Sequence, residues 1–176
     1  MAAPPVDASR RLPSACRAKR ASVPRVSAIP EGLHTITPHI VVGDAAEAAE
    51  WYARALGAVE RSRVPLPGGR VMTLELRFGD SSVMVASEFP DLGILSPLTV
   101  GGTATVLQLY TDDVDALWAR AVGAGAEVRH PLGDMFWGDR HGQIADPFGH
   151  HWNLARHARD VPPEEIARAA AEAFGG

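Results

Sequence analysis

Residues 37–58, TPHIVVGDAAEAAEWYARALGA, join a strand pattern to a helix pattern and decide how the rest of the chain is interpreted. The apolar run at the start is typical of a strand, and the Asp44 that follows it belongs to the residue types that cap helix N-termini. Apolar residues then recur at helical spacing until Gly57, a residue type that ends helices. We therefore predict a strand over 35–42 and a helix over 45–56.

Three strand patterns follow this helix and complete one unit. Turn signals separate them, Pro67-Gly68-Gly69 after the first and Gly79-Asp80 after the second. The predicted strands cover 58–64, 71–78 and 82–87. The first half of the chain is thus predicted to be a βαβββ unit.

The same order returns in the second half of the chain. A shift of 68 or 69 residues places Asp44 on Asp112 or Asp113, and it places Gly57-Ala58 on Gly125-Ala126. Such an internal repeat is a strong signal of organisation. The elements expected in the second unit are strands over 103–111, 126–130, 143–145 and 150–155 and a helix over 114–124.

The segments outside the repeats have different compositions. Residues 1–30 are rich in Pro, Ala and Arg, and we expect a disordered basic arm there. A Pro-, Gly- and Ser-rich linker, 88–102, joins repeat one (33–88) to repeat two (103–156). Residues 157–176 should form a short tail helix, whose apolar face packs on the domain or on a second subunit.

Charge and cysteine content exclude several classes of protein. The arm holds six basic residues and one acid, which leaves 11 basic and 20 acidic side chains, a net charge of −9, for the remainder. A body of that charge repels phosphate backbones, so we expect no nucleic-acid partner. The single Cys16 favours a reducing compartment, and no apolar run suits a signal peptide or a membrane span. We expect a cytoplasmic protein without a membrane partner.

Several stretches resemble the glyoxalase/bleomycin-resistance/dioxygenase (vicinal oxygen chelate) superfamily, and specifically its PhnB-like branch. The resemblance covers about residues 31–156 and implies an α+β fold in which two tandem βαβββ modules form a concave, cup-like mixed sheet. The matching stretches are Thr37 to Asp44, Trp51-Tyr52, Gly79-Asp80-Ser81, Tyr110 to Trp118, Phe136-Trp137-Gly138-Asp139-Arg140 and Asp146-Pro147-Phe148-Gly149-His150.

Metal-using members of the superfamily hold a divalent ion with ligands from the first and last strand of each repeat. The resemblance places these four positions at Thr37, Met84, Val106 and Asn153. None is a good ligand for a first-row metal ion, so we expect no metal and no cofactor. A shift of two residues keeps a side chain on the same strand face, and the alternative is then an atypical site made by His39, Gln108 and His151.

The cup itself offers residues for binding a ligand. Phe136 and Trp137 beside Arg140 suit a planar or anionic molecule. The alternative for Arg140 is an ion pair with Asp139, Asp146 or Glu75. On the strands, the further candidates for ligand binding are His39, Gln108, His151 and Asn153.

Proton transfer could be carried by His39, Glu75 or His151. The alternative for each histidine is a hydrogen-bonded wall residue, and for Glu75 a solvated sheet face. His150 belongs to the turn signature, where we expect it to bond nearby backbone.

Three functions remain open. The first is a metal-independent protein that binds a small organic molecule in the cup, as in drug-sequestering members of the superfamily. The second is a glyoxalase-like lyase or isomerase that uses acid-base residues or the atypical metal site. The third is a non-catalytic module that binds a protein partner. Members of the superfamily commonly pair, so we expect a homodimer.

Overall fold

The computed structural model describes residues 27–175, and the predicted arm therefore lies largely outside the described residues. The described chain consists of two βαβββ modules and a C-terminal helix. The first module contains β1 (His39–Val42), α1 (Ala45–Leu56), β2 (Val59–Pro65), β3 (Val71–Phe78) and β4 (Ser81–Ser87). After a short helix α2 (Pro97–Val100), the second contains β5 (Val106–Tyr110), α3 (Val114–Gly123), β6 (Glu127–Asp134), β7 (Asp139–Ala145) and β8 (His151–His157), followed by α4 (Pro163–Phe174).

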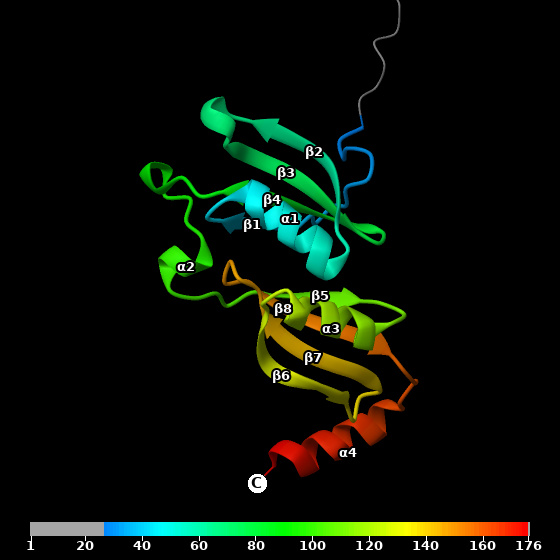
Figure 1. The fold of residues 1–176 in the computed structure, drawn as a ribbon. Coiled ribbons are helices and arrows are strands. Elements are labelled where there is room, and N and C mark those ends of the chain that lie inside the picture. The colour runs from blue at the N-terminus through cyan, green and yellow to red at the C-terminus, as the bar shows by residue number, and fades with distance from the viewer. Residues whose placement is uncertain (1–26, 176) are drawn as a thin grey trace, which may run out of the picture.

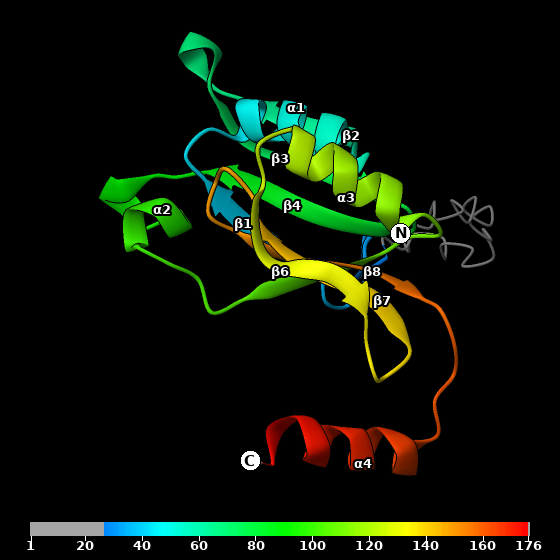
Figure 2. The same cartoon turned by 60° about the horizontal axis from the view of Figure 1, so that its bottom comes forward.

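Each module forms one four-stranded sheet with the same topology. Sheet 1 has the order β1-β4-β3-β2 and sheet 2 the order β5-β8-β7-β6. In both sheets the first strand pairs in parallel with the last, and the remaining pairs are antiparallel. The two modules lie one above the other in Figure 1, and Figure 2 shows α1 and α3 side by side on one side of the sheets. The predicted twin βαβββ fold is confirmed.

The core lies between each helix and its sheet. Asp44 caps α1 by accepting from the backbone N–H groups of Ala46 and Glu47, and Gly57 ends the helix at φ 74°. The helix face that carries Trp51 and Tyr52 is buried. Around Tyr52 stand the rings of Trp51, Phe78, Phe148 and Trp152, each with a centroid between 5.4 and 6.2 Å from that of Tyr52. This cluster joins the two modules through aromatic packing.

A buried carboxylate stands beside the cluster. Asp146 is 5% exposed and accepts from the Tyr52 hydroxyl at 2.6 Å and from Trp152 Nε1 at 2.9 Å. The backbone N–H groups of Phe148 and His150 donate to its other oxygen, both at 2.9 Å. Burial, and after it the charge of Asp146, raises the pKa of Tyr52 well above its usual value. The turn after β7 is thereby fixed against α1 of the other module.

Backbone acceptors of one module also bind side chains of the other. The Trp51 indole donates to the carbonyl of Ala124 at 2.8 Å, and His150 Nε2 bonds the carbonyl of Val41 at 2.9 Å. The predicted structural role of His150 is therefore borne out. Its backbone partner, however, belongs to the other module rather than to a nearby residue.

Strand limits differ from the sequence-based ones at several places. The first strand begins at His39, not at residue 35, because the hydroxyl of Thr37 donates to the carbonyl of His34 in a local turn and Pro38 has no N–H to donate. The fifth strand is likewise shorter than predicted, while β6 and β7 are longer. The linker contains the helix α2, which Ser96 caps.

No helix within residues 27–175 is long and apolar enough to cross a membrane. The predicted tail helix is present as α4. It lies beyond sheet 2 at the end of a single connecting segment (Figure 1), and none of its residues is fully buried.

Replacement by alanine is expected to change the stability of the protein in opposite directions at two glycines of sheet 2. A Cβ at Gly142 would stand 2.5 Å from the Trp118 ring and 3.0 Å from Leu132 Cα, whereas a Cβ at Gly133 would meet nothing within 4 Å. We expect Gly142→Ala to lower the free energy of unfolding by about 1–3 kcal/mol through overpacking. Gly133→Ala should change it by less than about 1 kcal/mol, in the stabilising direction. Urea unfolding of both variants measures this, and equal losses would contradict the packing argument.

Candidate functional site

The face of sheet 2 that points away from α3 carries most of the polar side chains discussed below, and we name it the concave face of sheet 2. Residues alternate between the two faces of a strand, and the core residues Trp152 and Leu154 face the helix. The concave face therefore receives Val106, Gln108 and Tyr110 from β5, His151, Asn153, Ala155 and His157 from β8, and Asp139, His141 and Gln143 from β7.

Three amide side chains form a row across this face. Gln108 pairs with Asn153 in the parallel β5–β8 register, and Asn153 pairs with Gln143 in the antiparallel β8–β7 register. Gln143 Nε2 donates to Asn153 Oδ1 at 2.9 Å, and Asn153 Nδ2 donates to Gln108 Oε1 at 3.0 Å. We call these three residues the amide row. Because the bonds all run in one direction, the three amides hold one another in a fixed orientation.

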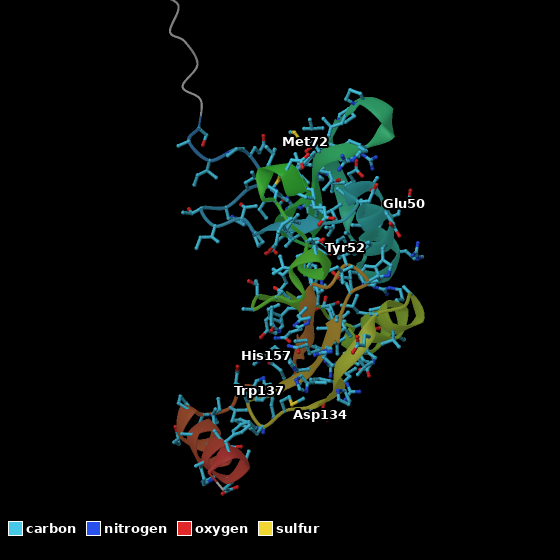
Figure 3. The ribbon with its side chains drawn as sticks, turned by 90° about the vertical axis from the view of Figure 1, so that its left-hand side faces the viewer. Glu50, Tyr52, Met72, Asp134, Trp137 and His157 are labelled. Carbon is cyan, nitrogen blue, oxygen red and sulfur yellow. The ribbon has the colours of Figure 1, made fainter. Side chains whose placement is uncertain are left out.

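A buried acid lies toward the end of the face that is nearest α4. Asp139 is 6% exposed, and its Oδ2 accepts from the Tyr110 hydroxyl at 3.0 Å and from Trp137 Nε1 at 3.3 Å. Its Oδ1 bonds Nδ1 of His157 at 2.9 Å. Figure 3 shows Trp137 and His157 close together between the sheet and α4. Asp139 thereby orients side chains from β5, from β8 and from the turn before β7.

His157 bridges two carboxylates. Its Nε2 bonds Asp160 Oδ1 at 3.0 Å, on the segment that leads to α4. The bond to Asp139, and after it the bond to Asp160, raises the pKa of His157 above its usual value. The pKa of Tyr110 is also raised, by burial and after it by the bond to Asp139.

His141 is the opposite case. Burial lowers the pKa of His141, and the neighbouring His130 acts in the same direction, against the attraction of Asp139. Its ring stands edge-on to Trp137, with centroids 5.7 Å apart. At neutral pH His141 is therefore an uncharged imidazole, which can accept a proton or a hydrogen bond.

The four positions implied for metal ligands do not offer the donor groups that a first-row metal ion prefers. Thr37 lies before β1, and its hydroxyl is engaged with His34. Met84 and Val106 offer a thioether and a hydrocarbon, and Asn153 is already bonded within the amide row. This donor set does not fit a first-row divalent ion, which prefers imidazole and carboxylate. Residues 27–175 contain no group of three or more His, Cys, Asp or Glu side chains suited to a metal ion.

The three residues of the atypical metal set line different hollows. His39 lines a hollow of ≈ 240 Å³ beside the linker, and Gln108 lines one of ≈ 530 Å³ along β5. His151 lines a third hollow, of ≈ 630 Å³, between α2 and the β7–β8 turn. None of these three hollows is lined by more than one of the three side chains.

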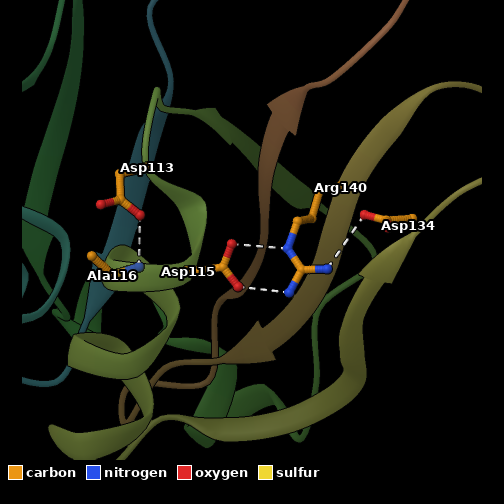
Figure 4. A network of polar contacts seen from close by, with 5 residues as sticks. All are labelled: Asp113, Asp115, Ala116, Asp134 and Arg140. Carbon is orange, nitrogen blue, oxygen red and sulfur yellow. Dashed lines mark hydrogen bonds and ion pairs between the residues drawn. The ribbon is translucent and has the colours of Figure 1, made fainter.

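Arg140 lies on the opposite face from the amide row. Its guanidinium donates to both carboxylate oxygens of Asp115 on α3, at 2.6 and 2.9 Å, and to Asp134 at 3.3 Å (Figure 4). The predicted ion pair exists, but with partners other than the expected Asp139, Asp146 or Glu75. The alternation along β7 explains this, because Asp139 and Arg140 point to opposite faces.

The remaining candidates are distributed over both modules. Phe136 packs its ring edge-on against Trp137, 4.9 Å away, and faces Phe174 of α4 at 6.5 Å. Glu75 belongs to sheet 1, where it accepts from the Ser82 hydroxyl at 2.7 Å. Neither Glu75 nor His39 lies in sheet 2, so neither belongs to the surface formed by the amide row and Asp139.

Sequence reasoning missed Gln143, Tyr110, Asp139, His141 and His157 as site residues. The one available signal was the period-2 spacing of Asp139, His141 and Gln143 along β7. It was obscured because the predicted seventh strand began at Gln143, whereas β7 begins at Asp139.

Comparisons with known proteins agree with this architecture. The model of the glyoxalase/bleomycin resistance protein/dioxygenase superfamily matches residues 32–154. Uncharacterised proteins of Mycobacterium tuberculosis and Mycobacterium bovis are 43% identical over 137 residues, which is 76% of this chain and 81% and 90% of theirs.

Solved structures show the same relationship. TioX from Micromonospora sp. ML1 is 30% identical, with a TM-score of 0.57, over 69% of this chain and 97% of its own. A PhnB protein of Bacillus cereus shares the fold at 16% identity, with a TM-score of 0.53, over 70% of this chain and 99% of its own. The chain belongs to the glyoxalase/bleomycin resistance protein/dioxygenase superfamily.

Proposed function

We propose that the protein binds a small organic molecule on the concave face of sheet 2, without a metal ion, and that it acts by sequestering this molecule. The observation that supports the proposal is the amide row, in which three polar side chains are held in one orientation on an accessible sheet face. Ordered polar groups beside aromatic rings are the usual composition of a ligand site. Trp137 and Tyr110 supply the rings.

The donor chemistry at Thr37, Met84, Val106 and Asn153 supports the metal-free part of the proposal. A protein of this superfamily that kept a chelating centre would need imidazole or carboxylate at these positions. Ligand recognition must then come from hydrogen bonding and stacking.

A glyoxalase-like lyase or isomerase is the second candidate. The observation that favours it is His141, whose lowered pKa keeps the imidazole neutral and thus able to accept a proton. His151 lies on the same face, and it is one of the residues that the sequence analysis named as candidates for proton transfer. Conversion of a bound ligand, lost in His141→Asn, would favour this function over sequestration.

The expected homodimer, the cytoplasmic location and the partner-binding alternative stay predictions. Light scattering on the purified chain tests the first. If a protein partner rather than a small molecule occupies the concave face, ligand screens of the native protein should give no hit. Substitutions in the amide row should then weaken the binding of that partner.

A thermal-shift screen tests the proposal. Dicarbonyls, thiol conjugates and aromatic antibiotics would be added to the purified protein with and without EDTA. A ligand at one hundred times its dissociation constant stabilises the folded state by about 2.7 kcal/mol, which corresponds to a rise in Tm of about 5–10 °C. We expect the same rise in EDTA, and a rise that requires a divalent ion would refute the metal-free proposal.

Two variants locate the binding. Asn153→Ala interrupts the amide row and should abolish the rise in Tm. Arg140→Gln removes a guanidinium from the opposite face and should leave the rise unchanged. The reverse result would place the ligand elsewhere.

A further inference from the structure

The Tyr110 side chain reaches across sheet 2. Tyr110 belongs to β5, its hydroxyl donates to Asp139 on β7, and β8 runs between these two strands. Neighbouring strands are about 4.8 Å apart, so the side chain has to stretch over β8 to reach the carboxylate. The buried acid therefore acts as a tether that holds the tyrosine side chain over β8.

The burial of a small residue on β8 agrees with this course. Ala155 is the register partner of Tyr110 on β8, and it points to the concave face, yet it is fully buried. Its small side chain leaves room for a ring directly above the strand. Tyr110 itself remains 57% exposed, so a large part of its surface is available to a ligand.

The amide row runs next to this ring. Gln108 precedes Tyr110 by two residues on β5, and Asn153 precedes Ala155 by two on β8. Within the row Gln143 uses one N–H, Gln108 uses its carbonyl, and Asn153 uses one of each. Within residues 27–175, Gln108 Nε2 donates no hydrogen bond and Gln143 Oε1 accepts none. A ligand edge above the row thus meets a free donor group at Gln108 and a free acceptor at Gln143.

From this arrangement we infer that the site takes a neutral, flat ligand with a carboxamide, lactam or ureide edge, whose ring stacks on Tyr110 while its edge pairs with the amide row. Such an edge carries a C=O beside an N–H and can use both kinds of group. A carboxylate has acceptors only, and it would also approach the Asp139 carboxylate at the end of the tyrosine ring. The inference rests on the proposed function and specifies its ligand class.

Small probes test the ligand class. Nicotinamide has the flat ring and the amide, nicotinate has the ring with a carboxylate, and cyclohexanecarboxamide has the amide without a flat ring. The side-chain amide cross-peaks of Gln108, Asn153 and Gln143 would be followed in ¹H–¹⁵N NMR titrations of the full chain. We expect nicotinamide to shift these peaks and to bind about tenfold more tightly than either other probe.

Variants assign the contribution of the ring. Tyr110→Leu should weaken nicotinamide binding about tenfold. Tyr110→Phe keeps the ring but loses the tether to Asp139, and it should weaken binding by a smaller factor, about threefold. Val106→Ala, on the same face of β5 but two rows from the tyrosine, should leave the affinity within about twofold. The phenylalanine variant keeps the test valid if the leucine variant does not fold.

Three results would overturn the inference: equal binding of nicotinate, equal binding of cyclohexanecarboxamide, or an unchanged affinity in both tyrosine variants. If these probes leave the amide peaks unmoved while a compound of the thermal-shift screen moves them, the ligand class is wrong and the proposed function stands. If no compound moves them, both are wrong.

Discussion

Replacing Asp146 with alanine is expected to lower the free energy of unfolding by about 3–5 kcal/mol, enough to remove a large part of the stability of an ordinary domain. The carboxylate accepts four hydrogen bonds in the core, from Tyr52, from Trp152 and from two backbone N–H groups. Without it, these donors stay buried and unpaired, which is the costly outcome for a polar group. The contact between the two modules should loosen at the same time.

Urea unfolding measures the effect of Asp146→Ala, and Asp112→Asn is the matched control. Asp112 is exposed, and its replacement by asparagine removes the same charge as Asp146→Ala does. This control should change the free energy of unfolding by less than about 0.5 kcal/mol. Tyr52→Phe, which removes only one of the four donors, should fall between the two. Equal stability of Asp146→Ala and Asp112→Asn would show that the buried network does not hold the modules together.

The fold could be predicted because its signals are local and occur twice. Asp44 caps α1 and Asp113 caps α3 through the same kind of contact, a carboxylate that accepts from backbone N–H groups in the first helical turn. Gly57 ends α1 at φ 74°, and Gly125, at φ 95°, follows the end of α3 at the corresponding position. Such features depend on a few consecutive residues, and a shift of 68 or 69 residues reveals their repetition.

The site could be predicted only in part because it depends on register between strands far apart in the chain. Gln108 and Asn153 were candidates individually, but their bond and the link to Gln143 follow from the pairing of β5 with β8 and of β8 with β7. Sequence spacing does not determine either pairing. The same holds for Tyr110 and Asp139, which lie on strands that are not neighbours.

Arg140 illustrates how one strand limit changes an interpretation. With β7 beginning at Asp139, the acid enters the concave face and the arginine faces α3, where Asp115 binds it. With the strand beginning later, both residues appeared to belong to one loop near the cup. A period-2 pattern assigns faces only after the strand limits are known.

Replacing Asp139 is expected to have the second large effect, and the outcome depends on the substitute. Asp139→Ala leaves the Tyr110 hydroxyl and the Trp137 indole without their acceptor, and the free energy of unfolding should fall by about 2–3 kcal/mol. Asp139→Asn keeps an acceptor for these two donors, so its loss should be smaller. The asparagine variant nevertheless lacks the negative charge of the carboxylate beside His157.

The asparagine variant therefore isolates the effect on His157. In the native protein the bond to Asp139 raises the pKa of His157 above its usual 6.5. A group whose pKa is raised on folding stabilises the folded state fully below its unfolded pKa, and this stabilisation is lost as the pH rises through the folded pKa. Native stability should thus decline as the pH rises from about 6 through the raised pKa, and Asp139→Asn should decline less over the same range.

Titration of the His157 Hε1 resonance and urea unfolding at pH 5.5 and 8.5 measure both effects. We expect the pKa of His157 to fall in Asp139→Asn and to fall less in Asp160→Asn, because Asp160 is exposed and its bond is the weaker cause of the shift. An unchanged pKa in Asp139→Asn would mean that the buried acid does not hold the imidazole. The tether of Tyr110, which depends on the same carboxylate, would then need another explanation.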